Sequence, residues 1–415
     1  MFARELPGAQ AQLERLRTCW RQSDGMLATV YRGSTCIDPT PLVADLGDTA
    51  PFLATLGFPE QALQLARAAS GHLTRGLFRR GERAYLFDNH DLVLGWLELH
   101  EQTGEDWLIE SSRHALAAVQ RECEVQGRLV DWGDPGGRSW RASAYNAGFV
   151  EVAVDLFHAT RDTSYLECAR RWARSLIHTR SFRKHGLWSR FDTPRFELLG
   201  AALGRLSRYG PVRMFKDNTN CVWGLLALFL EDQDGEIGAA LERFVAVVTR
   251  LFERHGHIPE FPGRDQQFDL SANIFVAELL ADIARFKALD AAFDLACRIV
   301  ESVERRRWKN GLLPRDARYC GDHLDMMVDF GVALCKLDAL GAGRRFYQRA
   351  EQGWQAVWRL HQSPHGLVQS VDSEGRVLDD RIIVKYQFLA TKALLVGEHT
   401  NVYDDTRLWR LLRDR

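Results

Sequence analysis

One glycine-centred unit recurs seven times along the chain, and this repeat constrains the fold more than any other feature. In each unit an amphipathic stretch ends near a glycine, a short extended piece follows, and a more apolar stretch comes next. The glycines are Gly25, Gly76, Gly127, Gly186, Gly256, Gly311 and Gly366. Their spacing of roughly 50 to 70 residues is typical of architectures that repeat one supersecondary unit. The unit predicts a helical hairpin.

The two helices expected in each hairpin differ in character. The stretch before the glycine, such as residues 106–122 or 346–361, has apolar residues at i, i+3, i+4 and i+7, which is typical of a helix with one face in water. The stretch after it, such as residues 92–100 or 221–230, is apolar nearly all round, which is typical of a helix buried on every side. We call the second kind the inner helices.

These patterns predict an all-α fold, an (α/α)6 or (α/α)7 toroid of helical hairpins with short β pieces at the loops. We expect a single domain over residues 1–415. Each glycine is expected to end its outer helix as a left-handed cap, and the two or three residues after it are expected to pair as a short strand. A toroid gathers the beginnings of its inner helices around one cavity, so the residues at these positions are the functional candidates.

Composition narrows the function classes. The chain is 46% hydrophobic with a net charge of −1, so bulk charge favours neither nucleic acid nor a membrane surface as a partner. No apolar run approaches the ~20 residues that a bilayer crossing needs, and the N-terminus lacks the apolar core of a signal peptide. The eight cysteines include no CxxC pair, which favours reduced thiols. We expect a cytoplasmic protein, and a homodimer is compatible with the sequence.

Polar residues are dense at the predicted beginnings of the inner helices. They are Asp45 and Asp48; Asp88, Asn89, His90 and Asp91; Tyr145 and Asn146; Asp217, Asn218 and Asn220; Asp269 and Asn273; Asp322, His323 and Asp325; and Lys385 with Tyr386. Helix capping explains one such residue per helix, but it does not explain two or three, or the histidines. Carboxylates, amides and aromatic rings together are typical of a carbohydrate pocket.

Four segments, in order over roughly residues 85 to 285, carry a family resemblance. The segment FDNHDLVLGWLEL at residues 87–99 resembles the HHD-[IL]-G helix start of the unsaturated glucuronyl and rhamnogalacturonyl hydrolases. Residues 127–141, 217–228 and 268–280 resemble the later strand and helix motifs of that family. The resemblance implies an (α/α)6 barrel. It also implies hydration of a 4,5-unsaturated uronic acid, in which a carboxylic acid protonates the double bond, water adds at the adjacent carbon, and the hemiketal opens.

The resemblance also assigns a catalytic role. Asp91 falls on one of the two essential aspartates of the family and would be the general acid, with His90 beside it to bind a substrate carboxylate. The second aspartate should begin the next inner helix, where this chain has Tyr145 and Asn146 instead. Asp217, Asp322, Asp325 and Asp329 are candidates for the second carboxylate from across the ring, because inverting glycosidases set two carboxyl groups roughly 6.5–9.5 Å apart.

Two other functions stay open. Tyr145 with His90 and Asn146 provides the groups that a polysaccharide lyase or a uronate C5-epimerase needs to remove and return the C5 proton. Alternatively, the chain is a catalytically inactive toroid that binds sugars. A lyase creates an ultraviolet chromophore, the hydrolase destroys one, and a binding protein does neither.

A set of residues near the predicted cavity mouth is expected to bind substrate. Trp132 and Trp223, like Trp188, suit stacking on sugar rings, and Arg141 suits bidentate contact with a uronate carboxylate. The full set is Asp88, Asn89, Trp132, Arg141, Asn146, Asn218, Asn220, Trp223, Asp269, Asn273, His323 and Lys385. The substrate expected from these residues is an acidic oligosaccharide or polysaccharide.

The residues at the helix starts also allow a comparison with two kinds of metal-dependent toroid. A zinc site of the lanthionine-cyclase kind would take Cys221, Cys320 and His323 as ligands. A terpene cyclase would need an acidic cluster, for which Asp322 and Asp325 are a poor match. Neither spacing fits a metal signature, and the sequence predicts no metal and no cofactor.

Overall fold

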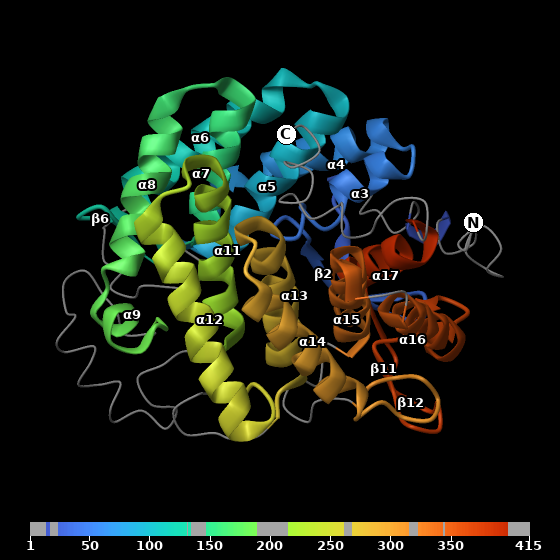
Figure 1. Cartoon of the computed structure of the whole chain (residues 1–415). Helices are drawn as coiled ribbons and strands as arrows, with labels where there is room; N and C mark the ends of the chain where they lie inside the picture. The colour runs from blue at the N-terminus through green and yellow to red at the C-terminus, as the bar shows by residue number, and fades with distance from the viewer. Residues whose placement is uncertain are drawn as a thin grey trace. The chain divides into compact units, whose positions relative to one another are not determined.

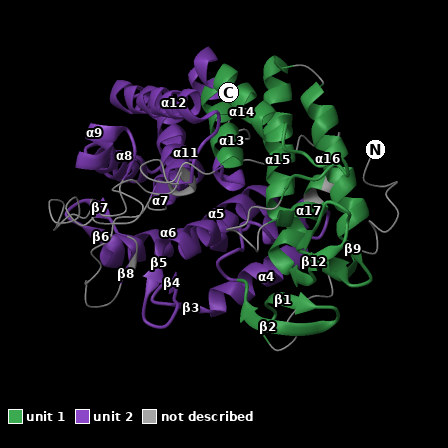
Figure 2. Ribbon diagram, turned by 90° about the horizontal axis from the view of Figure 1, so that it is seen from below, with its two compact units in different colours: residues 1–42, 273–285, 293–415 green, residues 43–272, 286–292 purple. Residues whose placement is uncertain are grey.

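The computed structural model describes residues 14–16, 24–130, 132–133, 147–188, 215–260, 268–314, 323–342 and 345–396 (Figure 1). The chain divides into two compact units (Figure 2). Unit 1 comprises residues 1–42, 273–285 and 293–415, and unit 2 comprises residues 43–272 and 286–292. The single domain expected from the repeat stays a prediction.

Unit 2 contains four helical hairpins in two layers. Its helices are α3 (Ala50–Thr55), α4 (Pro59–Gly71), α5 (Leu86–Thr103), α6 (Asp106–Cys123), α7 (Gly148–Thr160), α8 (Thr163–Ile177), α9 (Arg180–His185), α11 (Phe215–Asp232) and α12 (Gly235–His255). Helices α3, α5, α7 and α11 each pack on the helix that completes their hairpin, α4, α6, α8 and α12. They also pack on one another in chain order, α3 on α5, α5 on α7 and α7 on α11. The expected inner layer is therefore present in this unit.

Short strands link the helices of unit 2. They are β3 (Leu73–Thr74), β4 (Leu77–Phe78), β5 (Ala84–Tyr85), β6 (Glu124–Val125), β7 (Arg128–Leu129) and β8 (Trp132–Gly133). All pairings are antiparallel, β3 with β4, β6 with β7, and β5 with β8. The β5–β8 pair holds the backbone of Trp132 beside Tyr85, directly before α5 begins.

Unit 1 combines helices with a small antiparallel sheet. Its elements are β1 (Ala28–Arg32), β2 (Thr35–Pro41), α15 (His323–Leu337), the π-helical turn η2 (Asp338–Ala342), α16 (Arg345–His361), β9 (Gln362–Ser363), β10 (Gly366–Leu367), β11 (Ser370–Val371), β12 (Val377–Asp379), β13 (Arg381–Ile383) and α17 (Val384–Val396). The sheet has the order β13-β1-β2, and α15 packs on both α16 and α17. Helices α13 (Leu270–Lys287) and α14 (Asp290–Glu304) contribute residues to both units.

The repeated glycines share a positive φ but lie in different kinds of local structure. All seven have a positive φ, from 69° to 149°. Gly186 and Gly256 end helices α9 and α12 in the left-handed conformation, as expected. The cap prediction is wrong at Gly76 and Gly127, each of which is the second residue of a two-residue turn between paired strands. It is also wrong at Gly311, which lies in a turn beyond the end of α14, and at Gly366, which lies in β10. The residues before them, Arg75 and Gln126, also have positive φ, which is the requirement of a type I′ hairpin turn.

A recurrent hydrogen bond ties inner helices to the segment after the preceding glycine. Asn89 accepts from the Phe78 N–H at 2.8 Å and donates to the Phe78 carbonyl at 3.0 Å. Further members of the set are Asn218 with the Trp188 N–H, His323 with the Leu313 carbonyl, and Gln387 with both backbone groups of Leu367. We call these side chains the latches. Each side chain lies near the start of an inner helix and supplies a hydrogen-bond partner for backbone of the extended segment before it, where an unpaired buried group would be costly.

A buried ion cluster connects α15 with α13 inside unit 1. The Lys336 ammonium lies 2.7 Å from Oε1 of Glu278 and 3.0 Å from Oδ2 of Asp282, and the Lys336 side chain is only 1% exposed. Burial raises the pKa of Glu278 even though the nearby Lys336 charge opposes this. Removing the lysine would leave two buried carboxylates without a cation.

Two expectations from composition can be compared with the described residues. None of their helices combines the length and the hydropathy that a bilayer crossing requires. The cysteines in these ranges with free thiols are Cys36, Cys123, Cys168, Cys221, Cys297 and Cys335. That these thiols are reduced in the cell stays a prediction.

Candidate active site

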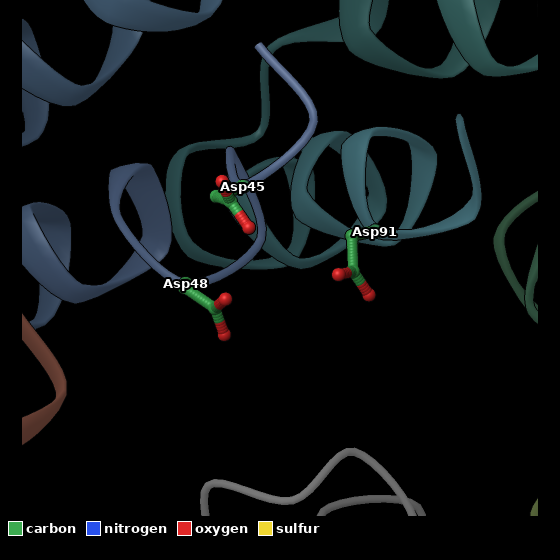
Figure 3. Close-up of side chains that lie close together, drawn as sticks. All are labelled: Asp45, Asp48 and Asp91. Carbon is green, nitrogen blue, oxygen red and sulfur yellow. The ribbon is translucent and has the colours of Figure 1, made fainter. Parts of the chain in front are cut away.

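Three aspartates meet where the loop before α3 lies against the first turns of α5. Asp45 and Asp48 come from the loop and Asp91 from the helix (Figure 3). One carboxylate oxygen from each lies within 4.8 Å of the others, and all three side chains are half-buried. In Figure 3 the side chains of Asp48 and Asp91 point to the same side. We call these three residues the carboxylate cluster.

Two glycines allow the loop to approach the helix closely enough to form this cluster. A Cβ atom at Gly95 would lie 2.8 Å from both Cα and N of Gly47, and one at Gly47 would lie 2.7 Å from the Asp91 carbonyl oxygen. Real Cβ atoms do not approach backbone this closely, so both positions require glycine. Gly95 lies one helical turn after Asp91, and its contact with the loop therefore sets the separation of the carboxylates.

His90 lies beside the cluster, and its ring is held on three sides. Its Nδ1 is 3.0 Å from the Phe87 carbonyl oxygen and its Nε2 is 3.0 Å from Oδ1 of Asp91. The ring packs against Gly148 at the beginning of α7, where a Cβ atom would lie 2.6 Å from the ring Cδ2. The side chains of His90 and Asp91 are 13% and 29% exposed. The pair is thus accessible to a small substrate.

The electrostatics of the pair favour a protonated imidazole. Burial is the largest single effect and lowers the pKa of His90. The charge and hydrogen bond of Asp91, together with Glu151 and the Phe87 carbonyl, raise it by more than burial lowers it. The pKa of His90 is therefore raised above its ordinary value.

Asp88 contributes to an ion pair next to the cluster. Both of its oxygens accept from the Arg80 guanidinium, at 2.6 and 2.8 Å, and its side chain is buried. This bidentate contact raises the pKa of Arg80. Asp88 is therefore the ion-pair partner of Arg80, and its contact with substrate stays a prediction.

Four residues expected to bind substrate are engaged with the protein itself. Asn89, Asn218 and His323 are buried latches, and Asp269 is the N-cap of α13, where it accepts from the Ala272 N–H at 2.5 Å. Their side chains hydrogen-bond to backbone groups, and their contact with substrate stays a prediction. Amides and carboxylates satisfy helix starts as readily as sugar hydroxyls, so sequence alone does not distinguish the two roles. Trp188 is buried as well, and its indole donates to the Leu176 carbonyl.

The remaining predicted site residues are placed as follows. Asn220 and Trp223 are half-buried on α11 in unit 2. Asn273 on α13, Asp325 on α15 and Lys385 on α17 belong to unit 1, and their share in a site with Asp91 stays a prediction. Tyr145, Asn146 and Arg141 lie outside the described residues, and for Trp132 and Asp217 the structure describes the backbone alone.

Sequence reasoning missed three residues at this site. Asp45 and Asp48 were named at a helix start but not as partners of Asp91, and Phe87 was not singled out. The signal for the aspartates was Gly47 between them, opposite a second glycine in the DLVLG segment. Phe87 is one of the few large apolar side chains in the described ranges that is well exposed, at 41%.

The carboxylate cluster is the group among the described residues that is compact enough to hold a metal ion. Acidic groups this exposed are common without an ion, and His90 already provides Asp91 with a cationic partner. We assign no metal to the cluster.

Comparison with known proteins identifies the fold. No protein family matches the chain by its sequence profile, and no curated protein sequence matches it. Several solved structures match almost the whole chain. A sugar epimerase from a ruminal bacterium has a TM-score of 0.57 at 11% identity, covering 96% of this chain and 99% of that one. A D-mannose isomerase has a TM-score of 0.55 at 12% identity, covering 94% and 97%.

An unsaturated glucuronyl hydrolase from Bacillus sp. GL1 is similar to the same extent, with a TM-score of 0.54 at 12% identity, covering 96% of this chain and 100% of that one. Structural similarity at such low sequence identity establishes a shared fold and no more. The chain is therefore an all-α toroid of helical hairpins with short strands at the loops. The resemblance to the unsaturated glucuronyl hydrolases is confirmed at the level of the fold.

Proposed function

We propose that the protein is a carbohydrate-active enzyme that hydrolyses an unsaturated or terminal uronyl residue of uronic-acid-containing oligosaccharides. The main support for the proposal is the environment of Asp91. Its carboxyl group is partly exposed, lies beside the His90 ring and is close to two further carboxylates. The fold supports it, because solved structures of this fold include sugar hydrolases, epimerases and a polysaccharide lyase.

The cluster supplies both groups that hydration of an unsaturated uronate needs. Asp91 gives its proton to one carbon of the double bond, and positive charge develops at the adjacent carbon and the ring oxygen. Asp45 and Asp48 stabilise that charge and accept a proton from the water that adds there. The hemiketal then opens. In this scheme the two loop aspartates replace the second aspartate that is absent at Tyr145.

The separation of the carboxylates agrees with this chemistry better than with direct inversion. Inverting glycosidases hold their carboxyl groups roughly 6.5–9.5 Å apart so that water fits between them and the sugar. In the cluster the oxygens lie within 4.8 Å of one another. Addition of water across a double bond places a proton on one carbon and a hydroxyl group on its neighbour, so an acid and a base held close together can serve both atoms from one face of the ring.

Ultraviolet absorbance over time tests the proposed function. Unsaturated uronyl disaccharides absorb through the conjugated double bond, so hydration should remove their absorbance when the protein is added. Intact polyuronates form the comparison panel, on which a rise in absorbance would identify a lyase. Unchanged absorbance on the disaccharides would contradict the proposal.

A lyase or C5-epimerase that uses Tyr145 and His90 is the second candidate. The contact that favours it is the packing of the His90 ring against Gly148, because Tyr145 lies three residues before Gly148 in the chain. Such an enzyme would raise the absorbance of a polyuronate, or exchange its C5 proton with deuterated water without a change in absorbance.

Phe87 is expected to form the platform on which the sugar ring stacks. It lies four residues before Asp91, on the same face of α5, and its ring centre is 6.1 Å from that of His90. Replacing Phe87 with alanine should raise KM about tenfold, equivalent to ~1.4 kcal/mol of lost binding, with kcat changed much less. Phe87→Trp should keep the wild-type KM. The two variants are compared by steady-state kinetics, and an unchanged KM in Phe87→Ala would rule out the platform.

A further inference from the structure

Both nitrogens of the His90 ring face hydrogen-bond acceptors. The Phe87 carbonyl can only accept, so Nδ1 at 3.0 Å must carry a proton. Nε2 lies 3.0 Å from a carboxyl oxygen of Asp91. If Asp91 is ionised, Nε2 must also be protonated; if Nε2 is not protonated, Asp91 must be. In either case one proton lies between the two side chains.

We propose that His90 and Asp91 share one transferable proton, and that His90 is the positioning residue that keeps this proton on the pair at neutral pH. The inference rests on the proposed function for the destination of the proton, which is the double-bond carbon of the sugar. An isolated aspartate has a pKa of about 3.9 and would be ionised at pH 7. The pair retains its proton to higher pH, so the acid is available where a lone carboxyl group would have lost it.

The charged groups around the pair are mostly negative, which opposes loss of the proton. Asp45 and Asp48 approach from the loop before α3, and Glu151 approaches from the first turn of α7. On α5 itself, the charge of Asp88 is balanced by Arg80. Release of the shared proton would add the negative charge of Asp91 to a neighbourhood that already holds these three carboxylates.

The ring of His90 is fixed in the orientation that sharing requires. The Phe87 carbonyl holds one edge of the ring. On the opposite side, a Cβ atom at Gly148 would lie 2.6 Å from Cδ2 and 2.7 Å from Cγ of the ring, so the ring fills the space that this glycine leaves. Only a residue without a side chain at position 148 allows Nε2 to face Asp91.

The protons of the step balance over one turnover. Transfer from Asp91 forms a carbon–hydrogen bond on the sugar and leaves Asp91 ionised beside a neutral His90 that keeps its Nδ1 proton. The water that adds bonds to the adjacent carbon through its oxygen and gives one proton to Asp45 or Asp48. That aspartate then releases the proton to solvent, and the His90–Asp91 pair takes one proton from solvent, so no net proton is consumed.

The pH dependence of kcat/KM distinguishes a shared proton from structural support. His90→Gln keeps an N–H that can donate to Asp91 but has no proton that titrates. We expect the alkaline limb of the kcat/KM profile of His90→Gln to lie at lower pH than that of the wild type, by about one unit or more. Activity that the variant loses at pH 7 should then return near pH 5, while KM stays unchanged. A loss of equal size at every pH, or an unmoved limb, would overturn the inference.

A measurement without substrate separates this inference from the proposed function. Ring resonances of His90 in the intact protein are followed by NMR against pH and are assigned by their absence in His90→Gln. The His90 midpoint should lie above the ordinary value of about 6.5, and it should fall in Asp91→Asn because burial then dominates. A low midpoint in the wild type would refute the pair. A high midpoint together with unchanged absorbance on the sugar panel would refute the function and leave the pair intact.

Discussion

Replacing Asp91 with asparagine should lower kcat by about 100- to 10,000-fold, the range expected when a general acid is removed. Asparagine has the same shape but carries no acidic proton. The fold should not suffer, because the side chain is partly exposed and the change removes one negative charge from the carboxylate cluster. We therefore expect an unchanged or slightly higher Tm. Steady-state kinetics on the disaccharide panel and thermal unfolding provide the two readings.

Asp106→Asn is the matched control for this variant. Asp106 is also an aspartate in the first turn of a helix, but it is exposed and lies on α6. Its activity should equal that of the wild type. If Asp91→Asn retains full turnover, Asp91 is not the acid. If the wild type binds sugars without turnover and Asp91→Asn binds them equally well, the protein is the inactive sugar-binding toroid.

Replacing Lys336 with methionine should destabilise the protein by about 3–5 kcal/mol, the usual cost of removing one partner from a buried ion pair. Glu278 and Asp282 would remain in the interior of unit 1 without their cation. Urea denaturation at pH 7 measures the loss. Arg32→Met is the control, because Arg32 pairs with Asp380 and both side chains are exposed, at 58% and 57%, and such surface pairs contribute about 0–1 kcal/mol. Equal losses in the two variants would contradict the prediction.

The deficit of the Lys336 variant should depend on pH in a defined direction. The pKa of Glu278 is already raised in the folded protein, mainly by burial, so the native state binds its proton more tightly than the unfolded chain does. The stability that comes from this group is therefore present at low pH and is lost as pH rises through the folded pKa. Without Lys336 that pKa rises further. The deficit should be smaller near pH 5 than at pH 8.

The fold was predictable because its signals are local in the sequence. Helix amphipathicity and the glycine period are readable without knowledge of tertiary contacts, and both reappear in the structure. The type I′ turns were not predictable, because Arg75 and Gln126 adopt positive φ although neither is a residue type that marks this conformation. The glycines after them were consequently assigned to helix caps.

The site was only partly predictable, for a related reason. His90 and Asp91 are adjacent in the chain, and a short motif revealed them. The approach of Asp45 and Asp48 to Asp91 depends on contact between Gly47 and Gly95. Both glycines are visible in the sequence, but they belong to different hairpins, and no local pattern pairs one with the other. The latch side chains could not be assigned from sequence, because the same amide and imidazole groups can hydrogen-bond to backbone or to a sugar.

The latches have a consequence for how a ring of hairpins can change in size. Each latch joins residues no more than 30 positions apart, and always to the segment that enters its own inner helix. The hydrogen bonds that align the parts of a hairpin therefore lie within that hairpin. A whole unit can be duplicated or deleted without changing these bonds in the other hairpins. Growth from six to seven hairpins then requires new contacts only between the inserted hairpin and its two neighbours.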